Sequence, residues 1–129
     1  MFSIVKIPYI NFKKYNIPIQ NKLVNSFKKT LSTGRYVNGQ SVDNFERKFS
    51  RFIGSNYSVG VSNGTCALRI ALKYLGIKKD DEVIVPANGF VSNVSSIIDN
   101  LAIPVFIDVN KDFNLNPDLI EKKITKKTK

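Results

Sequence analysis

The sequence predicts an α/β protein in which helices cover both faces of a parallel β-sheet, giving three layers. Two observations carry this prediction. The segments Glu82–Val85 and Pro104–Asp108 are continuous apolar runs rather than alternating ones, as expected for parallel strands that are buried on both faces. Apolar residues at helical spacing lie before and between these runs, and such a succession is typical of right-handed strand–helix–strand units.

Residues 1–53 are predicted to form an arm and two helices that precede a sheet domain at residues 54–129. The arm, residues 1–17, contains the extended-looking stretch IVKIPYINF, which includes Pro8, followed by polar residues. From Pro18 onward apolar side chains recur every four residues, which predicts an amphipathic helix that stops before Gly34. The segment that follows, residues 32–40, has the composition of a loop.

The second helix is predicted to begin at Ser41, a suitable capping residue, and to end before Gly54. Its apolar residues recur at spacings of three and four, and most are aromatic. We interpret this stripe as a core face rather than as a cofactor site. The stripe consists of Val42, Phe45, Phe49 and Phe52.

The sheet domain is predicted to alternate strands with helices. In order, the predicted elements are a strand at 57–61, a turn at 62–65, a helix at 67–75, a strand at 82–85, a turn at 86–89, a helix at 90–101, a strand at 104–108 and a helix at 117–124. Gly76 lies where a glycine commonly ends a helix.

The composition is that of a globular protein and excludes several kinds of site. The 129 residues are 43% hydrophobic and include no histidine and one cysteine. This excludes Ser-His-Asp catalysis, histidine-ligated metals, cysteine-rich zinc sites and disulfides within the chain, so we predict no metal site. Because no signal peptide or membrane-spanning run is visible, we expect a cytoplasmic protein with no membrane partner.

The net charge of +10 raises the alternative of a nucleic-acid-binding protein. Half of this charge comes from five lysines within residues 122–129, a segment without acidic residues. A nucleic-acid footprint should be a patch or stripe with aromatic residues between the charges, whereas this is a terminal run. We therefore favour a function without nucleic acid.

The predicted strands place polar residues where ligands of open α/β sheets bind, beyond the carboxyl ends of the strands. After the first strand, Ser62-Asn63-Gly64-Thr65 leads directly into a helix. Free backbone N–H groups and the positive end of the helix dipole would meet there and form an anion cradle. The alternative is that Ser62 or Asn63 only caps the helix.

Phe90 and Asp108 mark the other two strand ends. Phe90 could lie over a ring held at the first end, or it could be a core residue in the first turn of a helix. Asp108 could orient a ligand, or it could cap the turn that follows.

Read together, these segments resemble the DegT/StrS group of nucleotide-sugar aminotransferases, which are pyridoxal-phosphate (PLP) enzymes of fold type I. The resemblance begins at Ile7-Pro8 and keeps the family's order and spacing. It continues through Thr33–Gly39, Phe45-Glu46, Gly60–Leu68, Gly76-Ile77, Asp81–Pro86, Phe90–Ser92, Pro104–Asp108 and Ile124–Lys129. The chain therefore resembles the N-terminal half of the large domain of fold type I.

The resemblance implies roles for several residues in binding PLP and substrate. Backbone amides of Gly64, Thr65 and Cys66 would bind the PLP phosphate, and Phe90 would stack on the pyridine ring. Cys66 is a small residue at a helix start rather than a nucleophile. Candidates for substrate contacts are Arg35, Tyr36, Asn88 and Ser92.

Two positions depart from the family pattern. Gly89 stands where threonine is common, and Asn93 stands where threonine or a small residue is common. Both lie beside the aromatic residue that would stack on the cofactor ring.

The resemblance also implies that this chain lacks catalytic residues. In the family, the aspartate that pairs with the pyridine nitrogen and the lysine that holds PLP covalently lie beyond the position that matches Lys129. Without them the cofactor is a poorer electron sink, so we expect a truncated chain that does not transaminate by itself.

For the whole enzyme, the resemblance implies transfer of an amino group, from glutamate, to a keto group of a nucleotide-linked sugar. The product would enter polysaccharide or O-antigen synthesis, and the enzyme would be a homodimer. Three alternatives stay open. They are a module that binds phosphate or PLP without catalysis, part of a PLP-dependent sugar dehydratase, and the basic nucleic-acid binder.

Overall fold

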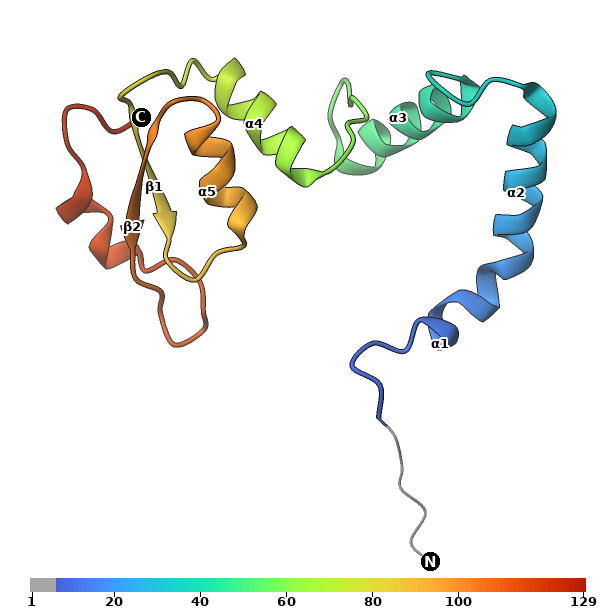
Figure 1. Cartoon of the computed structure of the whole chain (residues 1–129), viewed down its shortest axis with the longest axis horizontal. Helices are drawn as coiled ribbons and strands as arrows, with labels where there is room; N and C mark the ends of the chain where they lie inside the picture. The colour runs from blue at the N-terminus through green and yellow to red at the C-terminus, as the bar shows by residue number, and fades with distance from the viewer. Residues whose placement is uncertain (1–6) are drawn as a thin grey trace, which may run out of the picture. The chain divides into compact units, whose positions relative to one another are not determined.

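The computed structural model describes residues 7–129, so the first six residues of the predicted arm lie outside the described residues. The chain divides into two compact units, Met1–Gly60 and Val61–Lys129 (Figure 1). The predicted domain boundary between residues 53 and 54 stays a prediction. None of the helices within residues 7–129 has both the length and the apolar character needed to span a bilayer.

In the described part of the first unit, two short helical turns follow the stretch that was expected to be extended. These are α1, Phe12–Asn16, and the 3₁₀ turn η1, Ile17–Ile19. The side chain of Asn11 caps α1 by accepting a hydrogen bond of 3.1 Å from the backbone N–H of Lys14. This local cap explains why the polar end of the arm is helical.

Helices α2, Gln20–Thr33, and α3, Gln40–Ile53, agree with the two predicted helices. Both end at a glycine in the left-handed region, because Gly34 has φ 64° and Gly54 has φ 73°. The predicted cap at Ser41 is wrong. Gly39 caps α3 instead, and its carbonyl accepts a hydrogen bond of 2.9 Å from the N–H of Val42.

The aromatic stripe of α3 differs from the predicted core face. Phe45 and Phe49 stack with ring centroids 5.6 Å apart, yet they are 59% and 43% exposed. Phe52 is also exposed. Among the described residues of the first unit, no second layer covers this face of α3, and that is why its side chains stay in contact with solvent.

The strand predicted at residues 57–61 is wrong. This segment has no neighbouring strand among the described residues and is held instead by Glu46 of α3. The Glu46 carboxylate accepts a hydrogen bond of 2.6 Å from the N–H of Gly60, and its backbone carbonyl accepts one from the Ser58 hydroxyl. Hydrogen bonds to a helix therefore replace the ladder that a strand would need.

The second unit contains α4, Gly64–Tyr74, then β1, Glu82–Pro86, α5, Val91–Ile98, and β2, Ile103–Ile107. The strands β1 and β2 are parallel, with Glu82 opposite Ile103 and Pro86 opposite Ile107. Helix α5 is shorter than predicted, because Leu101 adopts a left-handed conformation with φ 61° and turns the chain toward β2.

The two strands lie between two layers. Helices α4 and α5 lie on one side, and the segment that contains the 3₁₀ turns η2, Pro117–Leu119, and η3, Glu121–Lys123, lies on the other (Figure 1). The helix predicted at residues 117–124 thus takes the form of two 3₁₀ turns. The core comprises Val85, Ile97 and Ala102, with Leu72, Ile77, Val83 and Val94 packed against it.

Candidate functional site

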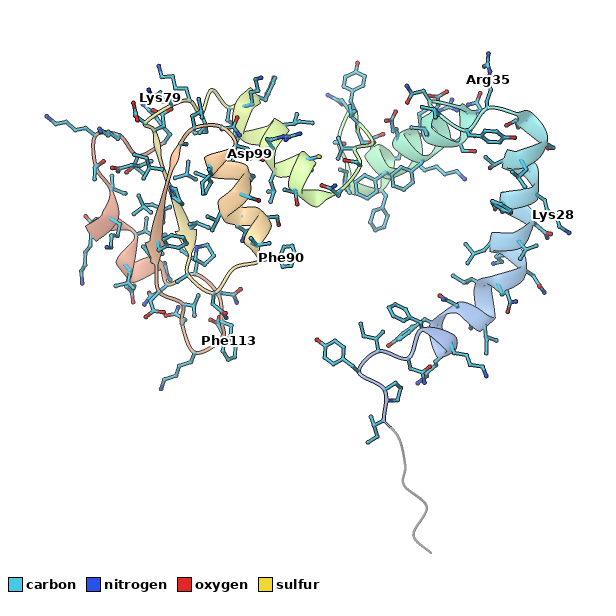
Figure 2. The ribbon with its side chains drawn as sticks, viewed as in Figure 1. Lys28, Arg35, Lys79, Phe90, Asp99 and Phe113 are labelled. Atoms are coloured by element: carbon cyan, nitrogen blue, oxygen red, sulfur yellow. The ribbon has the colours of Figure 1, made fainter. Side chains whose placement is uncertain are left out.

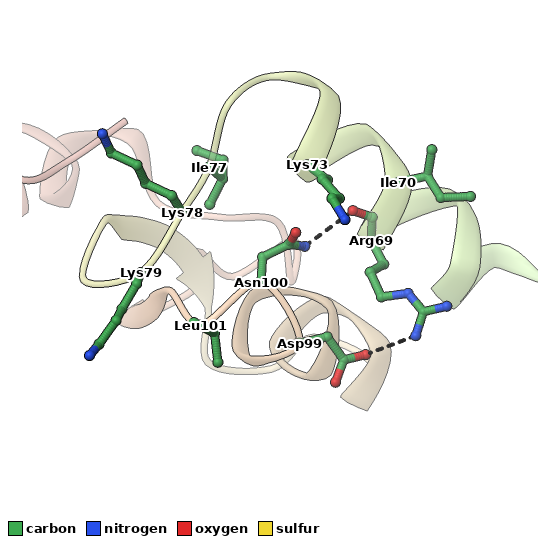
Figure 3. A pocket seen from close by; sticks show the side chains of 9 residues that line it. All are labelled: Arg69, Ile70, Lys73, Ile77, Lys78, Lys79, Asp99, Asn100 and Leu101. Carbon is green, nitrogen blue, oxygen red and sulfur yellow. Dashed lines mark hydrogen bonds and ion pairs between the residues drawn. The ribbon is translucent and has the colours of Figure 1, made fainter.

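Helices α4 and α5 are joined near their C-terminal ends (Figure 3). Arg69 forms an ion pair of 3.7 Å with Asp99, and the side-chain amide of Asn100 donates a hydrogen bond of 3.1 Å to the Arg69 carbonyl. The two helices run in the same direction (Figure 1). Because α5 begins just after β1 ends, both helix N-termini lie at the end of the unit where β1 and β2 terminate (Figure 1).

The turn before α4 combines a cap with free amides. The Asn63 side chain accepts a hydrogen bond of 2.9 Å from the N–H of Cys66, and its carbonyl accepts one of 3.1 Å from the N–H of Ala67. The capping interpretation is therefore confirmed. The N–H groups of Gly64 and Thr65 have no acceptor among the described residues, so two amides stay available to an anion.

The backbone at Gly64 is open to a ligand. A side chain added at Gly64 would meet no atom within 4 Å, so a ligand can approach the backbone closely. The thiol of Cys66 accepts weak hydrogen bonds from the Ser62 hydroxyl at 3.1 Å and from Arg69 at 3.9 Å. Because the Cys66 amide serves the Asn63 cap, the available cradle has two amides rather than the three expected.

Phe90 is not a core residue. It is the N-cap residue of α5, its side chain is 75% exposed, and it stands at the start of the helix (Figure 2). Asn88 is exposed nearby, whereas Ser92 is buried in the first turn of α5. An exposed aromatic ring at the carboxyl end of β1 is available to a planar ligand.

Asp108, Arg35 and Tyr36 provide less evidence for a ligand site. The Asp108 carboxylate accepts a hydrogen bond of 2.9 Å from the N–H of Val109, so it caps the turn that follows β2. Arg35 and Tyr36 lie in the loop between α2 and α3, where the Tyr36 hydroxyl donates to the Leu31 carbonyl at 3.3 Å. Their contact with substrate stays a prediction.

Sequence reasoning missed the packing of Asn93 against Gly89. A Cβ atom at position 89 would lie 2.7 Å from Asn93 Nδ2 and 3.2 Å from the Pro86 carbonyl oxygen. Gly89 does not have a positive φ, so the glycine provides space rather than an unusual conformation. Gly89 and Asn93 therefore fit against each other, and their spacing of four residues was the available signal.

This packing predicts that the effect of Gly89→Ala on the free energy of unfolding depends on whether Asn93 is present. In the native chain, Gly89→Ala is expected to destabilise the second unit by about 1 kcal/mol, because the methyl group displaces the Asn93 amide. In an Asn93→Ala background the same change should destabilise less, because the contact with the Asn93 amide is gone and only the one with the Pro86 carbonyl oxygen is left. Thermal unfolding followed by circular dichroism measures both effects, and equal destabilisation in the two backgrounds would contradict the packing.

A groove lies away from the strand ends. It has a volume of about 560 Å³ and lies between the C-terminal half of α4 and the turn after α5 (Figure 3). Its lining residues are Arg69, Ile70, Lys73, Ile77, Lys78, Lys79, Asp99, Asn100 and Leu101. The groove is basic, and no residue that sequence reasoning selected for binding lies in it.

Comparison with known proteins decides the family. The model of the DegT/DnrJ/EryC1/StrS aminotransferase family matches residues 18–129, which is most of the chain. The chain belongs to this family. The chain is 38% identical over 125 residues to the dTDP-3-amino-3,6-dideoxy-alpha-D-galactopyranose transaminase of Aneurinibacillus thermoaerophilus. This match covers 95% of the chain and 34% of the relative.

Two solved structures of aminotransferases share the fold. DesV of Streptomyces venezuelae has a TM-score of 0.90 at 31% identity, covering 95% of this chain and 33% of DesV. NtdA of Bacillus subtilis with bound cofactor PMP has a TM-score of 0.89 at 31% identity, covering 99% of this chain and 30% of NtdA. The predicted fold class is confirmed, and the chain spans about a third of the length of these aminotransferases.

Proposed function

We propose that this chain forms the part of a PLP-dependent sugar aminotransferase that binds the phosphate group of the cofactor. The whole protein would transfer an amino group, from glutamate, to a keto group of a nucleotide-linked sugar for polysaccharide synthesis. Membership of the aminotransferase family supports the reaction class. Relatives named as dTDP-sugar and UDP-sugar aminotransferases support the substrate class. The homodimer and the cytoplasmic location implied by the resemblance belong to the same proposal.

The observation that carries the proposal is the pair of free amides at the start of α4. The N–H groups of Gly64 and Thr65 point out of the N-terminus of an 11-residue helix whose dipole favours negative charge. A phosphate monoester fits this cradle, because Gly64 leaves open space above the backbone. The chemistry that PLP supplies when bound is an electron sink for the carbon that loses or gains the amino group.

The chain's own residues have binding and orienting roles in this proposal. Gly64 and Thr65 would hold the phosphate through their backbone amides, and the ring of Phe90 would stack on the pyridine. Asn63 holds the turn in place by capping α4 through the Cys66 amide. Asn88 and Ser92, which flank Phe90 in the sequence, are the proposed substrate contacts of this unit, and Arg35 and Tyr36 are those of the first unit.

By itself, the 129-residue chain is proposed to bind the cofactor phosphate without transamination. No catalytic residue of the family falls on its matched positions, as argued from the resemblance. Binding without transamination agrees with the alternative of a binding module. The proposal is supported by the fact that the chain spans only a third of the length of its relatives. We expect phosphate binding without transamination by this chain whether the whole protein is a dehydratase or an aminotransferase.

The test uses pyridoxamine 5′-phosphate (PMP), which lacks the aldehyde that would react with the many lysines of this chain. Because the chain has no tryptophan, a Phe90→Trp variant carries a single reporter at the proposed ring contact. PMP should quench its emission saturably, whereas pyridoxamine without the phosphate should bind at least about tenfold more weakly. Equal affinity for the two compounds, or no quenching by PMP, would refute the phosphate cradle.

A further inference from the structure

Hydrogen bonds join the elements that form the walls of the basic groove between α4 and the turn after α5 (Figure 3). The side-chain amide of Asn100 donates to the Arg69 carbonyl at 3.1 Å and to the Ser96 carbonyl at 2.9 Å. The N–H of Asp80, in the turn before β1, donates a hydrogen bond of 3.1 Å to the Leu101 carbonyl. Because these bonds link both walls, the groove is a fixed feature of the second unit.

The turn that follows α4 is fixed as well. The N–H of Ile77 donates a hydrogen bond of 3.0 Å to the Leu72 carbonyl at the end of the helix. The carboxylate of Asp81, which is only 8% exposed, accepts a hydrogen bond of 3.0 Å from the N–H of Lys78. A buried carboxylate therefore holds the backbone from which the Lys78 side chain extends. The groove is pre-formed, as small-molecule sites usually are.

The lining of the groove has an excess of positive charge at one end. Arg69 is paired with Asp99 at 3.7 Å, so these two charges compensate each other. Lys78 and Lys79 extend from the turn at the other end, and Lys73 extends from α4 (Figure 3). None of the three lysines forms an ion pair within residues 7–129. All three are exposed, and an ammonium group on its flexible stem can turn toward a bound anion.

Helix α4 does not account for all of this charge. Lys73 lies in the last turn of the helix, where a cation compensates the negative end of the helix dipole. That effect falls off within one turn, whereas Lys78 and Lys79 lie beyond the helix end at Tyr74. The nearby Asp80 is not among the lining residues. The ammonium groups of Lys78 and Lys79 are therefore available to a ligand.

The groove also has an apolar part. Ile70, Ile77 and Leu101 line it. Ile70 is 53% exposed and Leu101 is 68% exposed, so both present apolar surface to a ligand. The volume of about 560 Å³ falls within the range of about 300–1,000 Å³ that is typical of small-molecule sites. Such a lining fits a small molecule that carries a planar or apolar group beside several negative charges.

We propose that this groove binds a nucleoside diphosphate group, carried either by a free nucleotide or by a nucleotide-linked sugar. The two phosphates lie against the ammonium groups of Lys78 and Lys79, since lysine binds phosphate as a point charge. The base lies over the side chains of Ile70 and Leu101, which it shields from water. An inorganic phosphate would use only the charged part of the groove, and an uncharged nucleoside only the apolar part.

The groove shares no residue with the proposed phosphate cradle. Gly64 and Lys73 lie toward opposite ends of α4, about 14 Å apart along an axis that rises 1.5 Å per residue. A nucleotide in the groove therefore does not occupy the place of the cofactor phosphate. The inference goes beyond the proposed function, and failure of PMP to bind at the cradle would leave it standing.

Isothermal titration calorimetry of the 129-residue chain tests the ligand class. UDP should bind saturably, uridine at least about tenfold more weakly, and pyrophosphate at least about threefold more weakly, because each lacks one part of the ligand. Tighter binding of UDP than of UDP-glucose identifies the free nucleotide as the ligand, and the reverse identifies the nucleotide-linked sugar. Absence of saturable binding, or pyrophosphate binding as tightly as UDP, would overturn the proposal.

Two pairs of charge reversals separate binding in the groove from general attraction to a basic chain. Lys78→Glu combined with Lys79→Glu should weaken UDP binding at least about tenfold. Lys122→Glu combined with Lys123→Glu makes the same change of net charge in the layer on the other side of the sheet (Figure 1), and it should change the affinity by less than about threefold. Equal losses in the two double variants would contradict binding in the groove.

Amide resonances locate the bound nucleotide. UDP should shift the backbone resonances of Lys79 and Leu101 in the native chain and leave those of Gly64 and Thr65 in place. In the Lys78→Glu, Lys79→Glu double variant, an otherwise unchanged spectrum shows that the second unit is folded. Shifts confined to Gly64 and Thr65 would place UDP at the cradle and overturn the proposal.

Discussion

Replacing Ile97 with alanine is expected to remove a large part of the free energy of unfolding of the second unit. Ile97 is 2% exposed and belongs to a core of only a few buried apolar side chains. Truncating a buried isoleucine costs about 2–5 kcal/mol, because it removes apolar contacts and leaves a cavity. That is comparable with the lower range of total stability for a small domain, about 5 kcal/mol.

The neighbouring residue provides the control for this prediction. Ile98 is 53% exposed on the same helix, so Ile98→Ala makes the same chemical change at a site that leaves no cavity. Alanine has the higher helix propensity, so this variant should shift the free energy of unfolding by less than about 0.5 kcal/mol. Urea unfolding followed by circular dichroism compares the two, and similar midpoints would show that Ile97 is not a core residue.

Replacing Asn63 with aspartate is expected to weaken phosphate binding while leaving the fold intact. Aspartate caps helices as well as asparagine does, and its charge is favourable near the helix N-terminus. The same charge would lie beside the free amides of Gly64 and Thr65 and would repel a phosphate dianion by on the order of 2 kcal/mol. Affinity for PMP should fall by more than about tenfold, without a lower unfolding temperature.

The Asn63→Ser variant is the matched control, because serine also caps helices but carries no charge. It should keep the PMP affinity within about threefold of the native chain. If the aspartate and serine variants bind PMP equally well, the phosphate does not lie at this helix start. If both variants lose helix α4, the loss of PMP affinity results from the lost cap rather than from the added charge.

The sequence predicted those elements that local chemistry determines. The ends of α2 and α3 at Gly34 and Gly54 follow from the need for a left-handed residue, and that need is visible in a single glycine. The strand expected at residues 57–61 failed because a strand requires a partner, and the carboxylate of Glu46 competes for the backbone of this segment. Such a contact across 14 residues leaves no periodic signal.

The candidate site was predicted in its position but only partly in its detail. A polar turn before a helix located the free amides of Gly64 and Thr65. Capping by Asn63 and anion binding by the amides are compatible, because the side-chain cap uses only the Cys66 amide and leaves those of Gly64 and Thr65 without an acceptor among the described residues. Anion binding stays a prediction. The fit of Asn93 over Gly89 depends on side-chain geometry that residue spacing alone does not determine.

The uncovered aromatic face of α3 has a consequence for the colloidal behaviour of the chain. The stacked side chains of Phe45 and Phe49 form an exposed apolar surface, and such surfaces promote association between chains. The net charge of +10 opposes this association by repulsion between chains. Because salt screens the repulsion but leaves the apolar attraction, ionic strength becomes the variable that decides whether the chain stays dispersed at high concentration.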